Sequence, residues 1–185
     1  MNWKNVLALA TLSILAQPAL CQDKAEKKEA AKKAEVLEIG RGKVVITKPE
    51  SWKTVSPGMM IDNEFRFPAQ GDGSARITVS MAGGGVEPNI TRWIGQFEGA
   101  TKENTKVTKK DVDKTTVHIV EIEGTFKESK GPNAPVKKQE NYKMLSAILE
   151  QKDGALIFVK STGPKDTIAK MKDDFIKMID GLKNK

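Results

Sequence analysis

The sequence contains a single cysteine, Cys21, and a single histidine, His118. One cysteine cannot form a disulfide within the chain, so the fold depends on a packed core and not on covalent crosslinks. One histidine leaves any metal centre to be built largely from carboxylates. His118 also shares a strand face with Val120 and Ile122, which favours a packed or edge histidine over a catalytic base. We therefore expect no metal ion and no cofactor.

Catalytic groupings are equally scarce. No serine lies in the sequence context of a nucleophile elbow. The closest carboxylate pairs are Asp173 with Asp174, on the polar side of an expected helix, and Glu121 with Glu123, on the wet face of an expected strand. Neither pair brings a converging partner from another element. We assign no catalytic residue, and a hydrolase that uses carboxylates alone is the least favoured function.

Aromatic residues are few: three tryptophans, one tyrosine and six phenylalanines in 185 residues. They do not alternate with the lysines, as they would on a surface that stacks nucleic-acid bases. The net charge of +7 comes from 31 basic and 24 acidic residues. This balance is typical of a mixed, solvated surface and not of a nucleic-acid-binding stripe. We therefore expect no nucleic-acid partner.

Residues 1–21 have the parts of a secretory signal peptide. Lys4 supplies the positive start, an uncharged apolar run follows it, and Ala19 and Cys21 are small residues at the cleavage positions. The apolar run is too short to span a bilayer, which takes about 20 residues. These features predict export to the periplasm or the exterior. Cys21 also resembles a lipoprotein acceptor, but Leu20 before it is not small, so membrane anchoring through Cys21 is the less favoured interpretation.

Residues 22–35 form a charged segment of low complexity, rich in alanine, lysine and glutamate. This composition favours a solvated, partly helical spacer, and Glu29 and Lys33 have the spacing of a supportive ion pair. No apolar stripe would dock the segment on a core. We then expect a single folded domain over residues 36–185, which is long enough to bury a core.

Residues 142–162 predict the hairpin around which this domain is organised. Asp153 and Gly154 favour a type I′ turn, whose two central residues both need a positive φ. The strands on either side are apolar on both faces. The faces are Leu145, Ala147 and Leu149 against Met144, Ser146 and Ile148, then Ala155, Ile157 and Val159 against Leu156 and Phe158. Since a strand pair with one wet face would alternate with polar residues, this pair should be central in a sheet covered on both sides.

The other elements follow from their apolar periods. Strands are expected at residues 43–47, 60–67, 75–81 and 115–126, with the second and third paired as a hairpin. A first helix, capped by Asn89, should cover one side of the sheet. Its apolar face holds Ile90, Trp93, Ile94 and Phe97. A last helix is expected from Lys165 to Leu182.

Residues 127–138 hold two prolines, one glycine and four lysines, which predicts an exposed loop between two strands. A plain surface loop is favoured there, and a partner contact is the alternative. The exposed side of the first helix adds two polar side chains. The candidate interaction surface consists of Arg92, Gln96, Lys127, Lys130, Lys137 and Lys138.

Trp93, Phe97 and Met144 form a candidate apolar pocket between the sheet and the first helix. Such a pocket would suit a carrier of an apolar small molecule. Close packing in the core is the favoured interpretation of the same three residues. A carrier should retain its ligand during purification.

The expected order is strand, hairpin, helix, long strand, protruding loop, central hairpin and C-terminal helix. With AGGGVEPNITRWIGQF at the middle helix and YKMLSAILE followed by IFVKSTGP, this order resembles the PsbP/Mog1-like domain class over about residues 40–182. The chain also resembles small exported proteins of unassigned function in bacteria such as planctomycetes. The resemblance implies an α+β fold in which an antiparallel β-sheet is sandwiched between helices. It also implies an accessory or binding subunit and not a catalyst, and no functional residue is carried over.

The sequence therefore favours an exported, non-catalytic binding domain that acts through protein–protein contacts in the cell envelope. Its partner would be an envelope or secreted protein. The alternatives are the carrier of an apolar small molecule and, behind it, the carboxylate hydrolase.

Overall fold

The structure is a computed structural model that describes residues 34–67, 73–129 and 135–185. A compact unit spans Lys33–Lys185. The expected signal peptide (1–21) lies outside the described residues, as does the expected spacer (22–35) except for its last two residues. Neither helix of the described part is long and apolar enough to cross a membrane.

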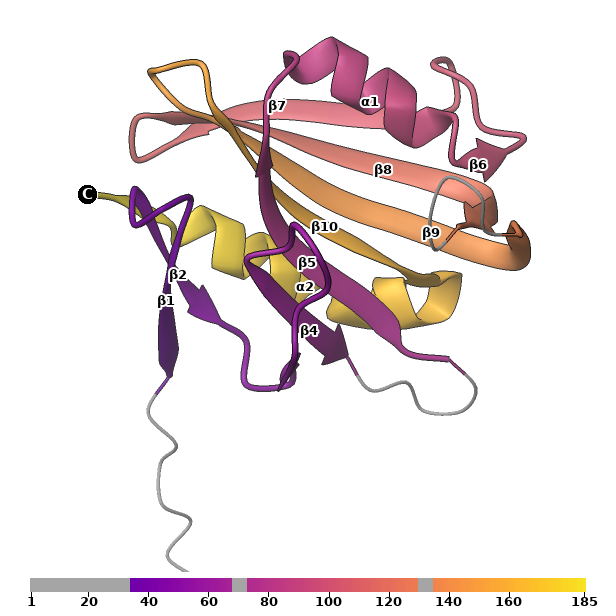
Figure 1. Cartoon of the computed structure of the whole chain (residues 1–185), viewed down its shortest axis with the longest axis horizontal. Coiled ribbons are helices and arrows are strands. Elements are labelled where there is room, and N and C mark those ends of the chain that lie inside the picture. The colour runs from indigo at the N-terminus through magenta and orange to yellow at the C-terminus, as the bar shows by residue number, and fades with distance from the viewer. Residues whose placement is uncertain (1–33, 68–72, 130–134) are drawn as a thin grey trace, which may run out of the picture. The chain divides into compact units, whose positions relative to one another are not determined.

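An eight-stranded antiparallel sheet forms the centre of the unit (Figure 1). The strands lie in the order β3-β4-β5-β10-β9-β8-β6, and β7 also pairs with β8. Their bounds are β3 Lys53–Val55, β4 Asn63–Phe67, β5 Ala75–Ala82, β6 Phe97–Glu98, β7 Lys106–Val112, β8 Thr115–Glu128, β9 Lys137–Glu150 and β10 Leu156–Pro164. A second antiparallel sheet has three strands in the order β1-β2-β11, which are Glu35–Ile39, Val44–Lys48 and Lys183–Asn184.

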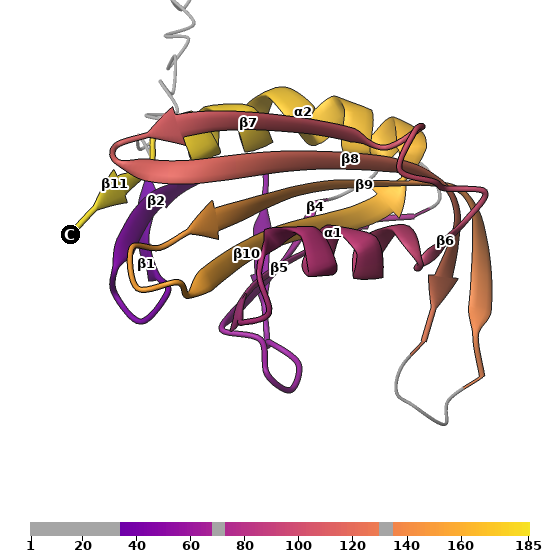
Figure 2. The same ribbon diagram turned by 90° about the horizontal axis from the view of Figure 1, so that it is seen from above.

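Two helices cover the large sheet from opposite sides, α1 (Val86–Ile94) and α2 (Lys165–Asp180) (Figure 2). The predicted α+β fold, with an antiparallel sheet between helices, is confirmed. The predicted faces of β9 and β10 are also confirmed. Leu145, Ala147 and Leu149 belong to the core cluster on the α2 side, and Met144 and Ile148 to the cluster on the α1 side.

The larger core lies between the sheet and α2. It includes Phe175 and Ile179 of the helix, Trp52 before β3, and Val44 and Ile46 of the small sheet. The smaller core lies under α1 and contains Trp93 and Phe158 in an edge-to-face contact with ring centroids 5.3 Å apart. Both faces of the central strands are therefore closed by apolar side chains, as their sequence requires.

The turn between β9 and β10 differs from the type I′ prediction, which was wrong. The loop has three residues, because Gln151 N–H donates to Ala155 O (2.9 Å) and Gly154 N–H donates to Gln151 O (2.9 Å). Gly154 has φ 79°, whereas Asp153 is not among the residues with positive φ. A three-residue loop needs one left-handed residue at its end, which glycine provides at little cost, so Asp153 is free to keep an ordinary conformation.

Asn89 does not cap α1, and that prediction was wrong. The helix begins three residues earlier, after Gly85. Pro88 fits in the first turn, where a backbone N–H needs no partner within the helix. Asn89 instead fastens the helix to the segment that enters it, since its Nδ2 donates to the carbonyl oxygens of Gly83 (3.0 Å) and Gly85 (2.7 Å). Phe97 lies beyond the helix, in β6, yet remains in the α1-side core.

The expected loop at residues 127–138 is shorter than predicted. β8 continues to Glu128 and β9 begins at Lys137, so that Lys127 lies opposite Lys138 and Glu128 opposite Lys137. The lysine-rich segment before residue 115, where no strand was predicted, forms the edge strand β7. Lysine is common on edge strands because its charge discourages pairing with another chain, which is why an apolar period did not reveal this strand.

Candidate functional site

The candidate site is centred on Lys160, on the side of the large sheet that α1 covers. Lys160 follows Phe158 at the strand period of two, so both side chains point to the α1 side. Lys160 lies opposite Thr78 of β5 and Ser146 of β9 in the register. A polar row of Thr78, Lys160 and Ser146 therefore crosses three strands beside the apolar α1-side core.

The ammonium group of Lys160 is mostly buried and has no acidic partner in the described part of the chain. Its Nζ donates to Oε1 of Gln96 at 2.6 Å and lies 5.8 Å from the ring centroid of Trp93. Burial lowers the pKa of Lys160 to about 8, with a further lowering from the positive charges of Arg92 and Arg76. A cation without a carboxylate in such a place is destabilised, which burial and like charge both predict.

The acid closest to this row in register, Glu64, is already engaged. Glu64 of β4 lies opposite Thr78, and only 5% of its side chain is exposed. Arg76 binds both of its oxygens at 2.9 and 2.8 Å, and Arg66 adds a contact of 3.1 Å. The hydrogen bond from Arg76 is the main reason why the pKa of Glu64 lies below its ordinary value. Glu64 thus orders two arginines and leaves Lys160 unneutralised.

The surface around Lys160 carries more positive than negative charge. The side chains of Arg66 and Arg76 remain 41% and 45% exposed although both contact Glu64. Arg92 is exposed on α1, where its Nη2 donates to Oδ1 of Asn89 at 2.7 Å. We call Arg66, Arg76, Arg92 and Lys160 the α1-side basic cluster. Opposite charge on a ligand or partner would be attracted to it.

Two exposed methionines lie on the loop that adjoins the α1-side basic cluster. Met59 and Met60 are 91% and 89% exposed. The loop is tied to the cluster because the N–H of Gly58 donates to Oε2 of Glu64 at 3.3 Å. Met60 has φ 61°, a conformation that a residue other than glycine adopts at an energetic cost. An apolar tip next to a charged patch is a composition found at binding surfaces.

Ser146 and Lys160 lie opposite each other, and in some hydrolases a lysine in such a pair activates the serine as a nucleophile. The hydroxyl of Ser146 is buried without a hydrogen-bond partner among the described residues. No part of Ser146 is exposed, at 0%. A nucleophile must reach its substrate, so this serine is not placed for catalysis in the structure. Within the described ranges, no group of histidine, cysteine and acidic side chains could hold a metal ion.

The structure places the candidate interaction residues at two sites. Arg92 and Gln96 flank Lys160, whereas Lys127, Lys137 and Lys138 lie where β8 and β9 leave the core. The two sites are connected by the backbone, since the N–H of Lys127 donates to the carbonyl oxygen of Gln96 at 2.8 Å. Lys138 pairs with Glu98 at 2.8 Å. Lys130 lies outside the described residues.

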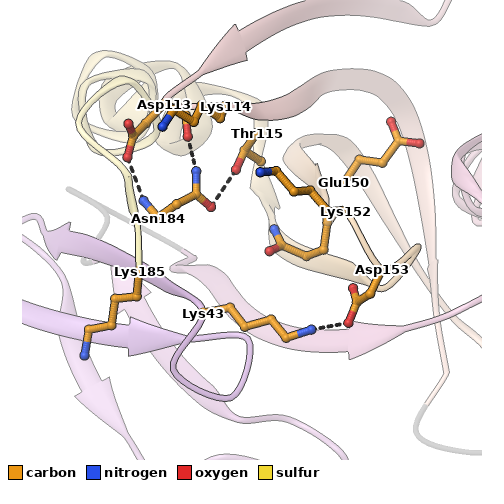
Figure 3. A pocket seen from close by; sticks show the side chains of 10 residues that line it. Lys43, Asp113, Lys114, Thr115, Glu150, Lys152, Asp153, Asn184 and Lys185 are labelled. Carbon is orange, nitrogen blue, oxygen red and sulfur yellow. Dashed lines mark hydrogen bonds and ion pairs between the residues drawn. The ribbon is translucent and has the colours of Figure 1, made fainter.

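The candidate pocket residues Trp93, Phe97 and Met144 are packed together in the α1-side core and are 2%, 3% and 0% exposed. Two hollows are lined by other residues. One, of about 520 Å³, lies at the turns near Lys43, Lys114 and Lys152 (Figure 3). The other, of about 440 Å³, lies near Glu123, Glu140 and Tyr142, beside the bulge at Gly124 and Phe126.

Lys160 itself was missed at the level of sequence, although a signal was present. It follows four residues, Leu156 to Val159, that had been assigned to a strand covered on both faces. The ammonium group of a lysine in such a strand must either be buried or extend past the helix that covers the sheet to reach water. Arg76 could not have been connected with it, because the two residues are neighbours only through the pairing of β5 with β10.

No protein-family model matches the sequence, and no curated protein matches it. Solved structures do match. The cyanobacterial PsbP (CyanoP) of Synechocystis sp. PCC 6803 aligns with 85% of this chain and 96% of its own, at 13% identity and a TM-score of 0.53. A protein of unknown function, PA94, from Pseudomonas aeruginosa aligns with 82% of this chain and 97% of its own, at 12% identity and a TM-score of 0.46.

A third structure is LpqN, involved in cell envelope biogenesis of Mycobacterium tuberculosis. Its alignment covers 83% of this chain and 86% of LpqN, at 9% identity and a TM-score of 0.41. Identities this low speak for the fold alone, and the CyanoP alignment extends over nearly all of that protein. The antiparallel sheet, the helix on each of its sides and this alignment together identify the described domain as PsbP-like in fold.

Proposed function

We propose that this chain is an exported, non-catalytic accessory domain of the cell envelope that binds an acidic segment of a partner protein on the α1 side of its large sheet. The observation that carries the proposal is Lys160, a mostly buried cation without an acidic partner among the described residues. A carboxylate brought by a partner would complete an ion pair there, as the carboxylate of Glu121 does on the other side of the sheet.

The charges around Lys160 support an acidic partner. Arg76 and Arg92 lie near Lys160, Arg66 shares Glu64 with Arg76, and all three guanidinium groups are exposed enough to be reached. Guanidinium groups bind carboxylates through two parallel hydrogen bonds and give up their water more readily than ammonium groups do. Complementary charge would also speed association and exclude basic proteins.

The exposed methionines support a protein partner over a small anion. Met59 and Met60 offer apolar, adaptable contact area beside the α1-side basic cluster. Protein interfaces combine methionine and arginine more often than the rest of a protein surface does. A free anion would use the charges and leave the methionines in water, whereas a protein segment could cover both.

Site-specific crosslinking in the host tests the proposal. A photoreactive amino acid replaces Thr91, an exposed neighbour of Arg92 on α1, in one variant and Lys170, an exposed residue of α2, in a matched control. We expect one partner at fixed stoichiometry from the Thr91 variant and not from the Lys170 variant, and native mass spectrometry of the untreated complex should give the same partner. Equal crosslinking from both helices, or a bare monomer in both experiments, would overturn the proposal.

A further inference from the structure

The loop between β3 and β4 contains a turn, residues 58–61, that carries the two most exposed large apolar side chains of the described residues. Met59 and Met60 are 91% and 89% exposed, whereas the three exposed valines are 44% to 60% exposed. Side chains this exposed add almost nothing to the packing of the domain. The stability of the fold therefore does not explain two adjacent methionines. We call residues 58–61 the methionine turn.

The methionine turn is held in place by backbone hydrogen bonds. The N–H of Ile61 donates to the carbonyl oxygen of Gly58 at 3.3 Å and closes the turn. After the turn, the N–H of Asp62 donates to the carbonyl oxygen of Val79 in β5 at 2.9 Å. The N–H of Gly58 donates to Oε2 of Glu64 at 3.3 Å. Because the turn is anchored on both sides, a partner would not have to order it on binding.

Met60 has a backbone conformation that favours other residue types. Its φ of 61° lies in the left-handed region. Glycine and asparagine are preferred at a turn position with positive φ, because they adopt it at little cost. Burial does not offset the cost for Met60, since the side chain is almost fully exposed. A strained residue with an exposed apolar side chain is explained by contact with another molecule.

The methionine turn adjoins the guanidinium groups of the α1-side basic cluster. A Cβ atom placed on Gly58 would lie 3.6 Å from Nη2 of Arg76. Arg66 and Arg76 both bind Glu64, and both remain partly exposed. Met59 follows Gly58 directly, and consecutive Cα atoms are only about 3.8 Å apart. An anion on these arginines and an apolar group on the methionines would therefore belong to neighbouring parts of one molecule.

We propose that the methionine turn binds a large apolar side chain of the partner segment, within about three residues of a carboxylate that pairs with Arg66 or Arg76. This inference rests on the proposed function and adds the pattern of the segment, which is acidic residues beside an aromatic or long aliphatic residue. Methionine suits such a contact because its side chain is unbranched and adaptable, and its sulfur packs favourably against aromatic rings.

Fluorescence anisotropy with labelled peptides tests the proposal on the natural protein. The probes are hexaglutamate with two phenylalanines at either end and the same peptides with two serines instead. At least one phenylalanine peptide should bind at least about fivefold more tightly than its serine counterpart. Equal affinities would overturn this inference and leave the proposed function standing, whereas no binding of any peptide would remove both.

A double variant makes the test specific. Met59→Ser with Met60→Asn should reduce the affinity for the phenylalanine peptide to that of the serine peptide, which should itself bind as before. Asparagine accepts a positive φ, so urea denaturation should show no loss of stability. The control Val36→Thr with Val107→Thr removes exposed apolar surface elsewhere and should keep the preference. A preference that survives in the methionine variant, or a loss of stability there, would overturn the proposal.

A lipid surface is the competing occupant of the methionine turn. Two methionines beside arginines that already share Glu64 offer little apolar area and little free charge for a membrane, so a peptide is favoured. Sedimentation with vesicles of phosphatidylglycerol and phosphatidylcholine separates the two. We expect no vesicle binding that depends on Met59 and Met60. Vesicle binding that the methionine variant loses would assign the turn to a lipid surface and overturn the proposal.

Discussion

Two buried charges on opposite sides of the large sheet, Glu121 and Lys160, have opposite surroundings. On the α2 side, Glu121 receives Lys172 at 2.9 Å and Lys143 at 2.8 Å, and Lys143 also contacts Glu123 at 3.0 Å. On the α1 side, the contacts of the Lys160 ammonium group among the described residues are the amide oxygen of Gln96 and the ring of Trp93. Glu121 is therefore neutralised within the domain, whereas Lys160 has no acidic partner in the described part of the chain.

The pKa shifts report the same difference. Burial tends to raise the pKa of Glu121, but the hydrogen bonds from Lys143 and Lys172 outweigh it and hold the pKa below its ordinary value. For Lys160 no such bonds oppose burial, and its pKa falls to about 8. Glu121 thus serves stability, and under the proposed function Lys160 gives up stability for binding, a trade that functional sites commonly make.

The largest effect is expected in the α2-side core. Phe175 is fully buried and packs against Trp52, with ring centroids 6.3 Å apart. Phe175→Ala should lower the free energy of unfolding by about 3–5 kcal/mol, measured by urea denaturation. The matched change Phe97→Ala, in a two-residue strand at the sheet edge, should cost less because its surroundings can relax. A greater loss from Phe97→Ala would contradict the division between the two sides.

Replacement of Lys160 should raise the free energy of unfolding and not lower it. Lys160→Met removes a cation whose burial costs about 3 kcal/mol at pH 7, a figure that follows from the lowered pKa. We therefore expect Lys160→Met to unfold at higher urea concentration than the natural protein. A side-chain-matched control, Lys172→Met, should be destabilising because it takes a partner from Glu121.

The dependence of this gain on pH sharpens the test. The unfolded chain binds the Lys160 proton more tightly than the folded protein does, so the penalty is complete below about pH 8 and is relieved as the pH rises toward the unfolded pKa. The stability difference between the natural protein and Lys160→Met should shrink from pH 8 to pH 10. A constant difference over that range would mean that the lysine charge is not its source.

Loss of the acid on the α2 side should have a smaller effect. Glu121→Gln should lower the free energy of unfolding by about 1–3 kcal/mol at pH 7, because Lys143 and Lys172 then lose their shared partner. The pKa of Glu121 is lower in the folded protein, so its contribution is present above the ordinary glutamate pKa and is lost as the pH falls through the folded value. Chemical denaturation at pH 7 and pH 3 measures this, and equal losses at both would contradict it.

The smallest change in stability should come with a large change in binding. Arg92→Glu relieves the like charge beside Lys160 but loses the hydrogen bond to Asn89, and because these two effects oppose each other the free energy of unfolding should move by no more than about 1 kcal/mol. Its affinity for a hexaglutamate peptide, measured by fluorescence anisotropy, should nevertheless fall at least about tenfold. Lys170→Glu, which changes charge equally on α2, is the control and should retain affinity.

The sequence predicted those elements of the fold whose apolar residues recur at a regular strand or helix spacing. Apolar residues on both faces of β9 and β10, and the helical spacing from Ile168 to Ile179 in α2, are local patterns that the structure confirms. The start of α1 was misplaced because Pro88 is compatible with a first helical turn and was not weighed there. β7 was missed because an exposed edge strand has no apolar period.

The candidate site could be predicted only in part. Arg92 and Gln96 were predicted to lie on the exposed side of the first helix and were chosen for that reason. In the structure both lie next to Lys160. Lys160 and Arg76 could not be joined without the pairing of β5 with β10. The hollow near Lys43, Lys114 and Lys152 could not be predicted either, since its walls come from turns that meet only in the folded domain.

The central claim is that Lys160 is a buried cation that a partner carboxylate would neutralise. Its most direct test is an NMR measurement of the Lys160 pKa through the labelled Nζ, first in the free protein and then with the hexaglutamate peptide. We predict a pKa of about 8 in the free protein and a rise of at least one unit on binding, because a carboxylate then supplies the missing charge. An ordinary lysine pKa in the free protein, or a lowered pKa that the bound peptide leaves unchanged, would contradict the account.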